Sequence, residues 1–349
     1  MVEVQPVPPR LVDEQGRVCF GVFDAPCPAV NIEDTRLKWH GMTLSPGFSR
    51  WRMKQWQHAA VITPELMLGF AAVDAGYLRT SWCHVLDRAT GTHFEHGRKG
   101  PRLDLRTARE LWDDRTFVHA REYCIDVHNH LKAGEHRVEI EIAAGRKRPA
   151  VRADLVCAHD LDAIEPLVLV MPVGDNRGAY SHKVVLPCSG SIAVGEQRHE
   201  LDPEQSFGIW DVHKAHYPRK MFWNWATGAG RLADGRSFGF NLTRNVNTED
   251  ERINENVVWL QGKRHHLAPA RFEIPRSKAS NAWRVRTADE ALDLRFQPQG
   301  ERAEALRLGV VQSVFHQPYG EFSGRAVVAG EDLEIRGLFG VCEDHRAVW

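Results

Sequence analysis

Acidic, imidazole and indole side chains recur at alternate positions between residues 210 and 225. Asp211 and His213 lie two residues apart, and Trp223 and Trp225 repeat that spacing shortly afterwards. Because alternate side chains of a strand point to the same face, we expect an acid, an imidazole and two indoles to line one cavity. An acid or imidazole there could protonate an alkene, an indole face could stabilise the carbocation, and capture of water would give a hydrate.

A second candidate group precedes this one along the chain. Tyr180 and His182 share one face of a predicted strand, whereas Lys183 takes the other. A lysine among apolar strands can be desolvated and act as a base, or it can extend its amine to solvent at a rim. Indole and amide or carboxylate groups that could contact a ligand are contributed by Trp210, Asn241, Glu255 and Asn256. The structural alternative is that Asp211 caps a turn, His213 is exposed and the tryptophans are core residues.

One segment resembles a metal site. Asp126, His128 and His130 alternate along a predicted strand, and Glu135 follows at the H-x-H-x4-E spacing that cupins use. Two imidazoles and a carboxylate suit iron, manganese or zinc. The leading glycine and the later histidine of a cupin are absent, so solvent-facing histidines are the alternative and we predict no metal. The phosphate-loop, dinucleotide, nucleophile-elbow and H-E-x-x-H motifs are also absent, so we expect no cofactor.

Composition limits the partners of this 349-residue chain. Its 45 Lys and Arg residues balance 46 Asp and Glu residues, and the net charge of -1 provides no overall field that would attract nucleic acid. No uninterrupted apolar run is long enough for a membrane-spanning helix, and the N-terminus does not have the pattern of a signal peptide. Seven irregularly spaced cysteines favour reduced thiols over a disulfide framework. We therefore predict a cytoplasmic protein of undetermined oligomeric state.

Short alternating segments separated by turns, without helix-length spacers, predict an all-β fold. The hairpin sequence at Ser189–Gly190 recurs at Ser323–Gly324, and F-G-I-W-D-V-H at 207–213 recurs 132 residues later as F-G-V-C-E-D-H. This internal repeat predicts two tandem antiparallel β-barrel domains. We place an N-terminal surface arm at 1–17, the first barrel at 18–216 and the second at 217–349.

The same motifs resemble a known family, the domain of unknown function numbered 2804. The matching features are Y-x-H-K from Tyr180, W-x-W-A from Trp223, G-F-N-L from Gly239, E-N from Glu255, and the terminal G-x-x-E-D-H-x-x-x-W that ends at Trp349. The resemblance covers the chain from about residue 21. It implies two lipocalin-like barrels related to the carotenoid-hydratase and AttH-like group, which includes cofactor-free hydratases and cyclases of hydrophobic substrates.

Together these observations predict a lipocalin-like protein that takes a hydrophobic small molecule. The first hypothesis is a cofactor-free hydratase, dehydratase or isomerase of an isoprenoid- or lipid-like substrate. The second is a non-catalytic carrier of such a ligand. The third is a metal-dependent cupin-like oxygenase that uses His128, His130 and Glu135.

Overall fold

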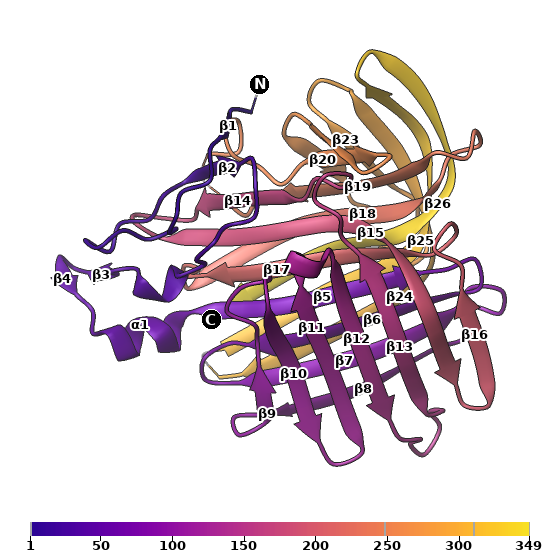
Figure 1. Ribbon diagram of the computed structural model, residues 1–349, viewed down its shortest axis with the longest axis horizontal. Helices are drawn as coiled ribbons and strands as arrows, with labels where there is room; N and C mark the ends of the chain where they lie inside the picture. The colour runs from indigo at the N-terminus through magenta and orange to yellow at the C-terminus, as the bar shows by residue number, and fades with distance from the viewer. Residues whose placement is uncertain (1, 248, 310, 349) are drawn as a thin grey trace.

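Two curled antiparallel sheets make up nearly all of the protein (Figure 1). The computed structural model describes residues 2–247, 249–309 and 311–348, and Trp349 of the terminal motif lies outside them. The first sheet contains fifteen strands: β1 (Val4–Gln5), β2 (Gly21–Phe23), β5 (Lys54–Ile62), β6 (Leu66–Asp74), β7 (Arg79–Asp87), β8 (His93–Gly100), β9 (Asp104–Arg106), β10 (Asp114–Ala120), β11 (Tyr123–His130), β12 (Glu135–Ile142), β13 (Val151–Ala158), β14 (Leu167–Pro172), β15 (Gly178–Val194), β16 (Gln197–Leu201) and β17 (Phe207–Ala215).

The second sheet is built from the rest of the chain. Its nine strands are β18 (Lys220–Arg231), β19 (Ser237–Arg244), β20 (Val257–Leu260), β21 (Lys263–His266), β22 (Ala270–Glu273), β23 (Trp283–Thr287), β24 (Leu292–Leu308), β25 (Val311–Val328) and β26 (Glu331–Val348). Since β17 ends at Ala215 and β18 begins at Lys220, the strands change sheet where we place the boundary between the two barrels.

The two sheets share one strand order, which confirms the internal repeat. The first runs β8-β7-β6-β5-β17-β15-β13, and the second runs β21-β20-β19-β18-β26-β25-β24. In the first sheet, β17 lies between β5 and β15. In the second sheet, β26 lies between β18 and β25 in the same way. The all-β fold with two lipocalin-like barrels is therefore confirmed.

The glycine of each repeated S-G hairpin has a steric reason. Gly190 and Gly324 have φ angles of +108° and +154°. A Cβ on Gly190 would lie 2.1 Å from the backbone oxygen of Asp154, and one on Gly324 would lie 2.2 Å from that of Asp293. Only glycine fits both the backbone angle and the close approach of the neighbouring strand.

Three of the apolar clusters lie inside and between the two barrels. The interior of the first barrel includes Phe70, Tyr123, Leu155 and Trp210, and the interior of the second includes Phe240, Trp283, Phe296 and Phe322. A third cluster lies between the barrels and is formed by side chains on the opposite faces of the same strands, among them Ile209, Trp225 and Val341. Removing a large apolar side chain from water stabilises the fold by about 1.5–3 kcal/mol. Because these strands bury apolar side chains on both faces, burial fixes the position of both faces.

The N-terminal segment 1–17 is anchored to the first sheet, because β1 pairs with β2 and Leu11 and Val12 are fully buried against that sheet. One prediction about the chain needs correction. Cys157 and Cys188 are paired in a disulfide rather than reduced. These two cysteines are 31 residues apart in sequence but face each other across β13 and β15, so their pairing depends on strand register. In the described part of the chain, no helix has the length and apolar character needed to cross a membrane.

Candidate active site between the two barrels

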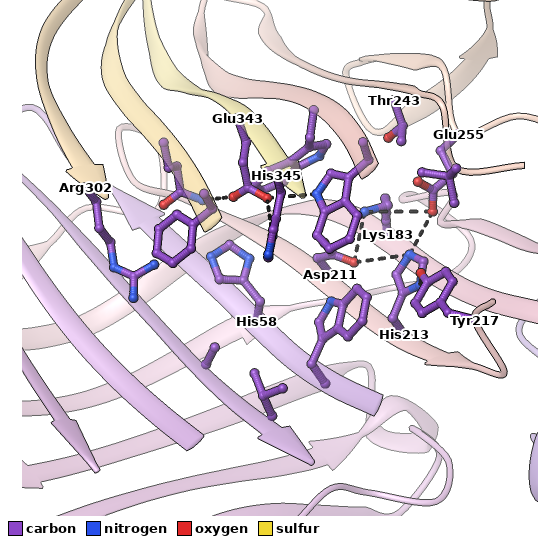
Figure 2. A pocket seen from close by; sticks show the side chains of 18 of the residues that line it. His58, Lys183, Asp211, His213, Tyr217, Thr243, Glu255, Arg302, Glu343 and His345 are labelled. Atoms are coloured by element: carbon purple, nitrogen blue, oxygen red, sulfur yellow. Dashed lines mark hydrogen bonds and ion pairs between the residues drawn. The ribbon is translucent and has the colours of Figure 1, made fainter. Parts of the chain in front are cut away.

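Asp211 and His213 share a strand face, as predicted, but that face does not line a barrel interior. It is the outer face of β17 and lies against the second sheet, whereas Trp210 points into the first barrel. The repeat places Glu343 and His345 on the corresponding face of β26. These four side chains line one cavity of about 160 Å³ between the barrels (Figure 2).

Strand register sets the aromatic wall of this cavity. On β17, Asp211 and His213 pair with His58 and Trp56 of β5. On β26 the corresponding positions pair with Trp225 and Trp223 of β18. Since each repeat supplies an acid, an imidazole and two ring-bearing neighbours, the cavity has an approximate twofold relationship between its two halves.

A buried ion network occupies the first half of the cavity. Lys183 Nζ lies 2.9 Å from Asp211 Oδ1 and 3.9 Å from Glu255 Oε1. Glu255 Oε1 is also 2.9 Å from His213 Nε2, and the Tyr217 hydroxyl is 3.1 Å from His213 Nδ1. These side chains come from β15, β17 and the connections after β17 and β19, so the network joins the two barrels (Figure 2).

Electrostatics keep this network charged. Burial alone would lower the pKa of Lys183, but the charges of Asp211 and Glu255 outweigh burial and raise it. Burial alone would raise the pKa of Glu255, but Lys183 and His213 bring it well below its usual value. The pKa of Tyr217 is raised far above 10 by burial and by the nearby carboxylates. At neutral pH the cavity therefore holds an ammonium, a carboxylate and an intact phenol.

Both ring nitrogens of His213 have partners. Because a carboxylate only accepts hydrogen bonds, His213 Nε2 donates to Glu255, and the Tyr217 hydroxyl lies 3.1 Å from Nδ1. The Trp56 ring stacks on His213 with a centroid distance of 4.6 Å and an interplanar angle of 12°. His213 is therefore fixed in position at both nitrogens and on one face.

The second half of the cavity differs in charge. Gln317 Nε2 donates to Glu343 Oε2 (2.6 Å), so an amide contacts this carboxylate where a lysine contacts Asp211. Trp223 Nε1 also donates to Glu343 (2.8 Å), and His345 Nδ1 lies 3.4 Å from it. Burial alone would raise the pKa of Glu343, but the hydrogen bond from His345 and its charge lower it.

A cation closes the far end of the cavity. The Arg302 guanidinium lies 4.0 Å from the ring centroid of Trp82 and 4.7 Å from that of Phe315, and it forms an ion pair with Glu95. Nearby, burial lowers the pKa of His58 to about 4, so this imidazole is neutral at pH 7. His58 Nδ1 is buried without a hydrogen-bond partner among the described residues.

Several predicted residues lie away from the cavity. Tyr180 packs with the N-terminal residues on the other face of β15, and His182 shares that face. Trp210 contacts His136 inside the first barrel, with ring centroids 4.7 Å apart. Their opposite orientation to Lys183 and Asp211 follows from strand alternation. Of the residues that the sequence singles out, the cavity is lined by Lys183, Asp211, His213, Trp223, Trp225 and Glu255.

Asn241 and Asn256 support the cavity wall from behind. Asn241 Oδ1 accepts a hydrogen bond from Trp225 Nε1 (2.7 Å), and its Nδ2 donates to the backbone oxygen of Glu255 (2.6 Å). Asn256 Oδ1 accepts from the backbone nitrogen of Thr243 (2.8 Å). Both amides therefore hold cavity residues in position rather than facing the space a ligand would occupy.

The histidine strand does not form a ligand set. His128 and His130 stack on each other with centroids 5.8 Å apart. His130 contacts Asp113, and Glu135 contacts Arg137. Among residues 2–247, 249–309 and 311–348, no group of three or more His, Cys, Asp or Glu side chains is placed to hold a metal ion. The donor geometry therefore gives the cupin hypothesis no support.

A family model described as a domain of unknown function, DUF2804, matches residues 2–349. The chain belongs to this family. No curated protein matches the sequence.

Solved structures share the fold of this DUF2804 protein. CghA, solved with Sch210972, is 11% identical at a TM-score of 0.52, and the alignment covers 85% of this chain and 88% of that one. Kievitone hydratase from Nectria haematococca is also 11% identical, at a TM-score of 0.50 and with the same coverage of both chains. A putative AttH from Nitrosomonas europaea is 14% identical at a TM-score of 0.45, with 84% and 92% of the two chains covered. At this level of identity the first two likenesses establish the fold.

Sequence reasoning did not identify most of the cavity wall. Trp56, His58 and Tyr217 are not singled out by any motif, and the repeat that contains Glu343 and His345 is compatible with a structural or a catalytic role for that pair. The repeat could have revealed Trp56 and His58, because they occupy the positions in the first copy that Trp223 and Trp225 occupy in the second.

Proposed function

We propose that this protein is a cofactor-independent acid–base enzyme that adds water to, removes water from, or isomerises an unsaturated apolar molecule. The observation that carries the proposal is the buried network of Lys183, Asp211, Glu255 and His213, which faces an aromatic-lined cavity. Burying these charges is costly unless they are paired. Perturbed, paired titratable groups in a cleft are typical of catalytic sites.

In hydration, each group has a distinct task. Asp211 Oδ1 lies 2.9 Å from the Lys183 ammonium, and we assign it the role of the base. It takes one proton from water, and the water oxygen forms the new C–O bond. The electron pair of the alkene then takes a proton from Tyr217, whose raised pKa keeps it protonated.

Proton exchange with water completes the cycle. Asp211 releases the proton that it collected and the Tyr217 phenolate takes one back, so the site returns to its resting state with no net gain or loss of protons. His213 Nδ1, 3.1 Å from the Tyr217 hydroxyl, holds that hydroxyl in position. The reverse sequence of steps removes water. If the site instead removed a proton from one carbon and returned a proton to another, without adding water, the double bond would shift.

The shape of the cavity indicates the class of substrate. A volume of about 160 Å³ is comparable to apolar cavities that accept a single benzene-sized ring. Indole walls at Trp56, Trp223 and Trp225 favour an unsaturated or cyclic group. The substrate we propose is an isoprenoid- or lipid-like molecule whose reacting ring or double bond enters this cavity. The shared fold with a protein named as a hydratase supports this class of reaction.

The test begins with the ligand. Protein purified under native conditions from its source would be examined by native mass spectrometry, and any bound molecule would be extracted and identified. That molecule would then be incubated with the protein in water enriched in ¹⁸O and, separately, in deuterium. We expect incorporation of oxygen-18 for hydration, or of deuterium alone for isomerisation.

Two variants separate an enzyme from a carrier. Asp211→Asn should reduce turnover by at least about a hundredfold while ligand affinity stays within a few fold. The matched control is Asp344→Asn, since Asp344 is a buried, ion-paired aspartate on β26 that does not line the cavity. If wild-type protein binds the molecule without incorporating either isotope, the protein is a carrier and the enzymatic proposal is wrong.

A further inference from the structure

Residues 38–52 form a projecting segment that is unusually apolar for an exposed surface. Six large hydrophobic side chains are exposed in the described chain, and four of them lie in this segment: Trp39, Met42, Phe48 and Trp51, which are 46–62% exposed. The segment consists of the hairpin β3 (Lys38–Trp39) and β4 (Met42–Thr43), followed by α1 (Pro46–Arg52). It extends from one end of the molecule (Figure 1). We call it the aromatic arm.

The aromatic arm is also basic. Between Asp34 and Glu65 the sequence contains no acidic residue, although the protein as a whole is almost neutral. Lys38 and Arg50 are exposed, and neither forms an ion pair with any residue that the structure describes. The arm therefore presents uncompensated positive charge beside exposed indole, thioether and phenyl groups.

This combination favours one kind of partner. Tryptophan, phenylalanine and methionine side chains insert at the boundary between headgroups and acyl chains, and nearby cations attract anionic headgroups. A symmetric contact between two copies of the chain would instead bring like charges together. We infer that the aromatic arm binds the surface of an anionic lipid bilayer.

The arm is held in an orientation that exposes these groups. Ser45 caps α1 by accepting a hydrogen bond from the backbone nitrogen of Phe48. The Phe48 and Trp51 rings lie 5.5 Å apart, and Trp51 also contacts Tyr77 at 5.6 Å. Phe48 and Trp51 therefore lie close together on a capped helix.

The base of the arm is attached to the cavity wall. Arg52 Nη2 donates to the backbone oxygen of Tyr217 (3.4 Å), and Trp56 follows four residues later on β5. Both Tyr217 and Trp56 line the cavity. Lipid binding by the arm would thus hold the Trp56 end of the cavity near the membrane surface, where apolar molecules are concentrated.

Vesicle flotation with purified full-length protein tests this inference without requiring a substrate. The probes are vesicles of phosphatidylcholine alone and vesicles of phosphatidylcholine with phosphatidylglycerol. We expect the wild-type protein to float with the anionic vesicles, to be released by high salt, and to show a blue shift of its tryptophan emission. Binding to the neutral vesicles should be at least about tenfold weaker.

Two variants test the two halves of the argument. The charge-reversed pair Lys38→Glu with Arg50→Glu, and the polar pair Trp39→Ser with Met42→Ser, should each lower binding to anionic vesicles by at least about tenfold. Arg336→Glu, an exposed change on β26, is the matched control and should bind as the wild type does. Failure of the wild type to float, or equal flotation of all variants, would overturn the inference. So would sedimentation showing that the wild type self-associates and that the polar pair abolishes this association.

Discussion

The charge balance of the cavity makes Lys183 its most sensitive position. Lys183→Met keeps most of the side-chain volume but removes the cation that lies between Asp211 and Glu255. Two buried carboxylates would then share the site without that compensation. Breaking a buried ion pair by removing one partner typically costs about 3–5 kcal/mol of unfolding free energy, and we expect a loss in that range at pH 7.

The sign of the pH dependence follows from Glu255. Its folded-state pKa is lowered by Lys183, so the pair stabilises the protein above the ordinary glutamate value of 4.5, and this contribution is lost as the pH falls through the folded-state pKa. In the Lys183→Met protein part of this contribution is missing at neutral pH. The stability difference from wild type should therefore be full at pH 7 and should shrink as the pH falls below about 4.5.

Urea unfolding followed by tryptophan fluorescence measures this difference. Lys263→Met is the matched control, because Lys263 pairs with Glu165 at the surface and such pairs contribute less than about 1 kcal/mol. A triple variant that combines Lys183→Met with Asp211→Asn and Glu255→Gln should recover much of the lost stability, since it removes the uncompensated charges. If Lys183→Met is no more damaging than the control, the buried ion network does not exist as described.

Two further changes test the backbone and the buried histidines. Gly190→Ala forces a Cβ against the backbone oxygen of Asp154 at a φ of +108°. We expect the unfolding free energy measured in urea to fall by about 1–3 kcal/mol. The control is Gly100→Ala, where a Cβ meets open space and the unfolding free energy should change little. Equal effects at the two glycines would contradict this steric account. Burial lowers the pKa of His58 and His216 from 6.5 to about 4. Between pH 4 and 6.5 the unfolded state therefore binds more protons than the folded state, and the unfolding free energy should fall as the pH drops from 6.5 to 4. Urea titrations across that range check this, and a flat profile would show that these histidines are not buried as neutral groups.

The features that sequence could predict are those set by local periodicity. Alternation placed Asp211 with His213 and Trp223 with Trp225, and the structure brings all four to one cavity. The repeated hairpin predicted two equivalent barrels, and the common strand order confirms them. The domain boundary at 216 and 217 and the catalytic roles stay proposals.

The features that sequence could not predict depend on which face meets which neighbour. Alternation assigns Tyr180 and Lys183 to opposite faces, but it does not say which face is covered by the N-terminal residues and which by the second barrel. Tyr217 joins the site only because its hydroxyl reaches His213 from the connection after β17. Long-range packing decides which face of β15 is covered and where the Tyr217 hydroxyl lies. No short pattern in a single sequence reveals that packing.

The two halves of the cavity also bear on how a substrate would orient itself. A cavity with true twofold symmetry would accept an asymmetric molecule in two equivalent directions, and half of the bound molecules would be the wrong way round. Here Lys183 in one half is matched by Gln317 in the other, which places a cation beside one carboxylate and a neutral amide beside the other. This difference makes the two directions unequal in energy. Divergence between the repeats at this position is thus one way in which a duplicated fold can favour a single direction of binding.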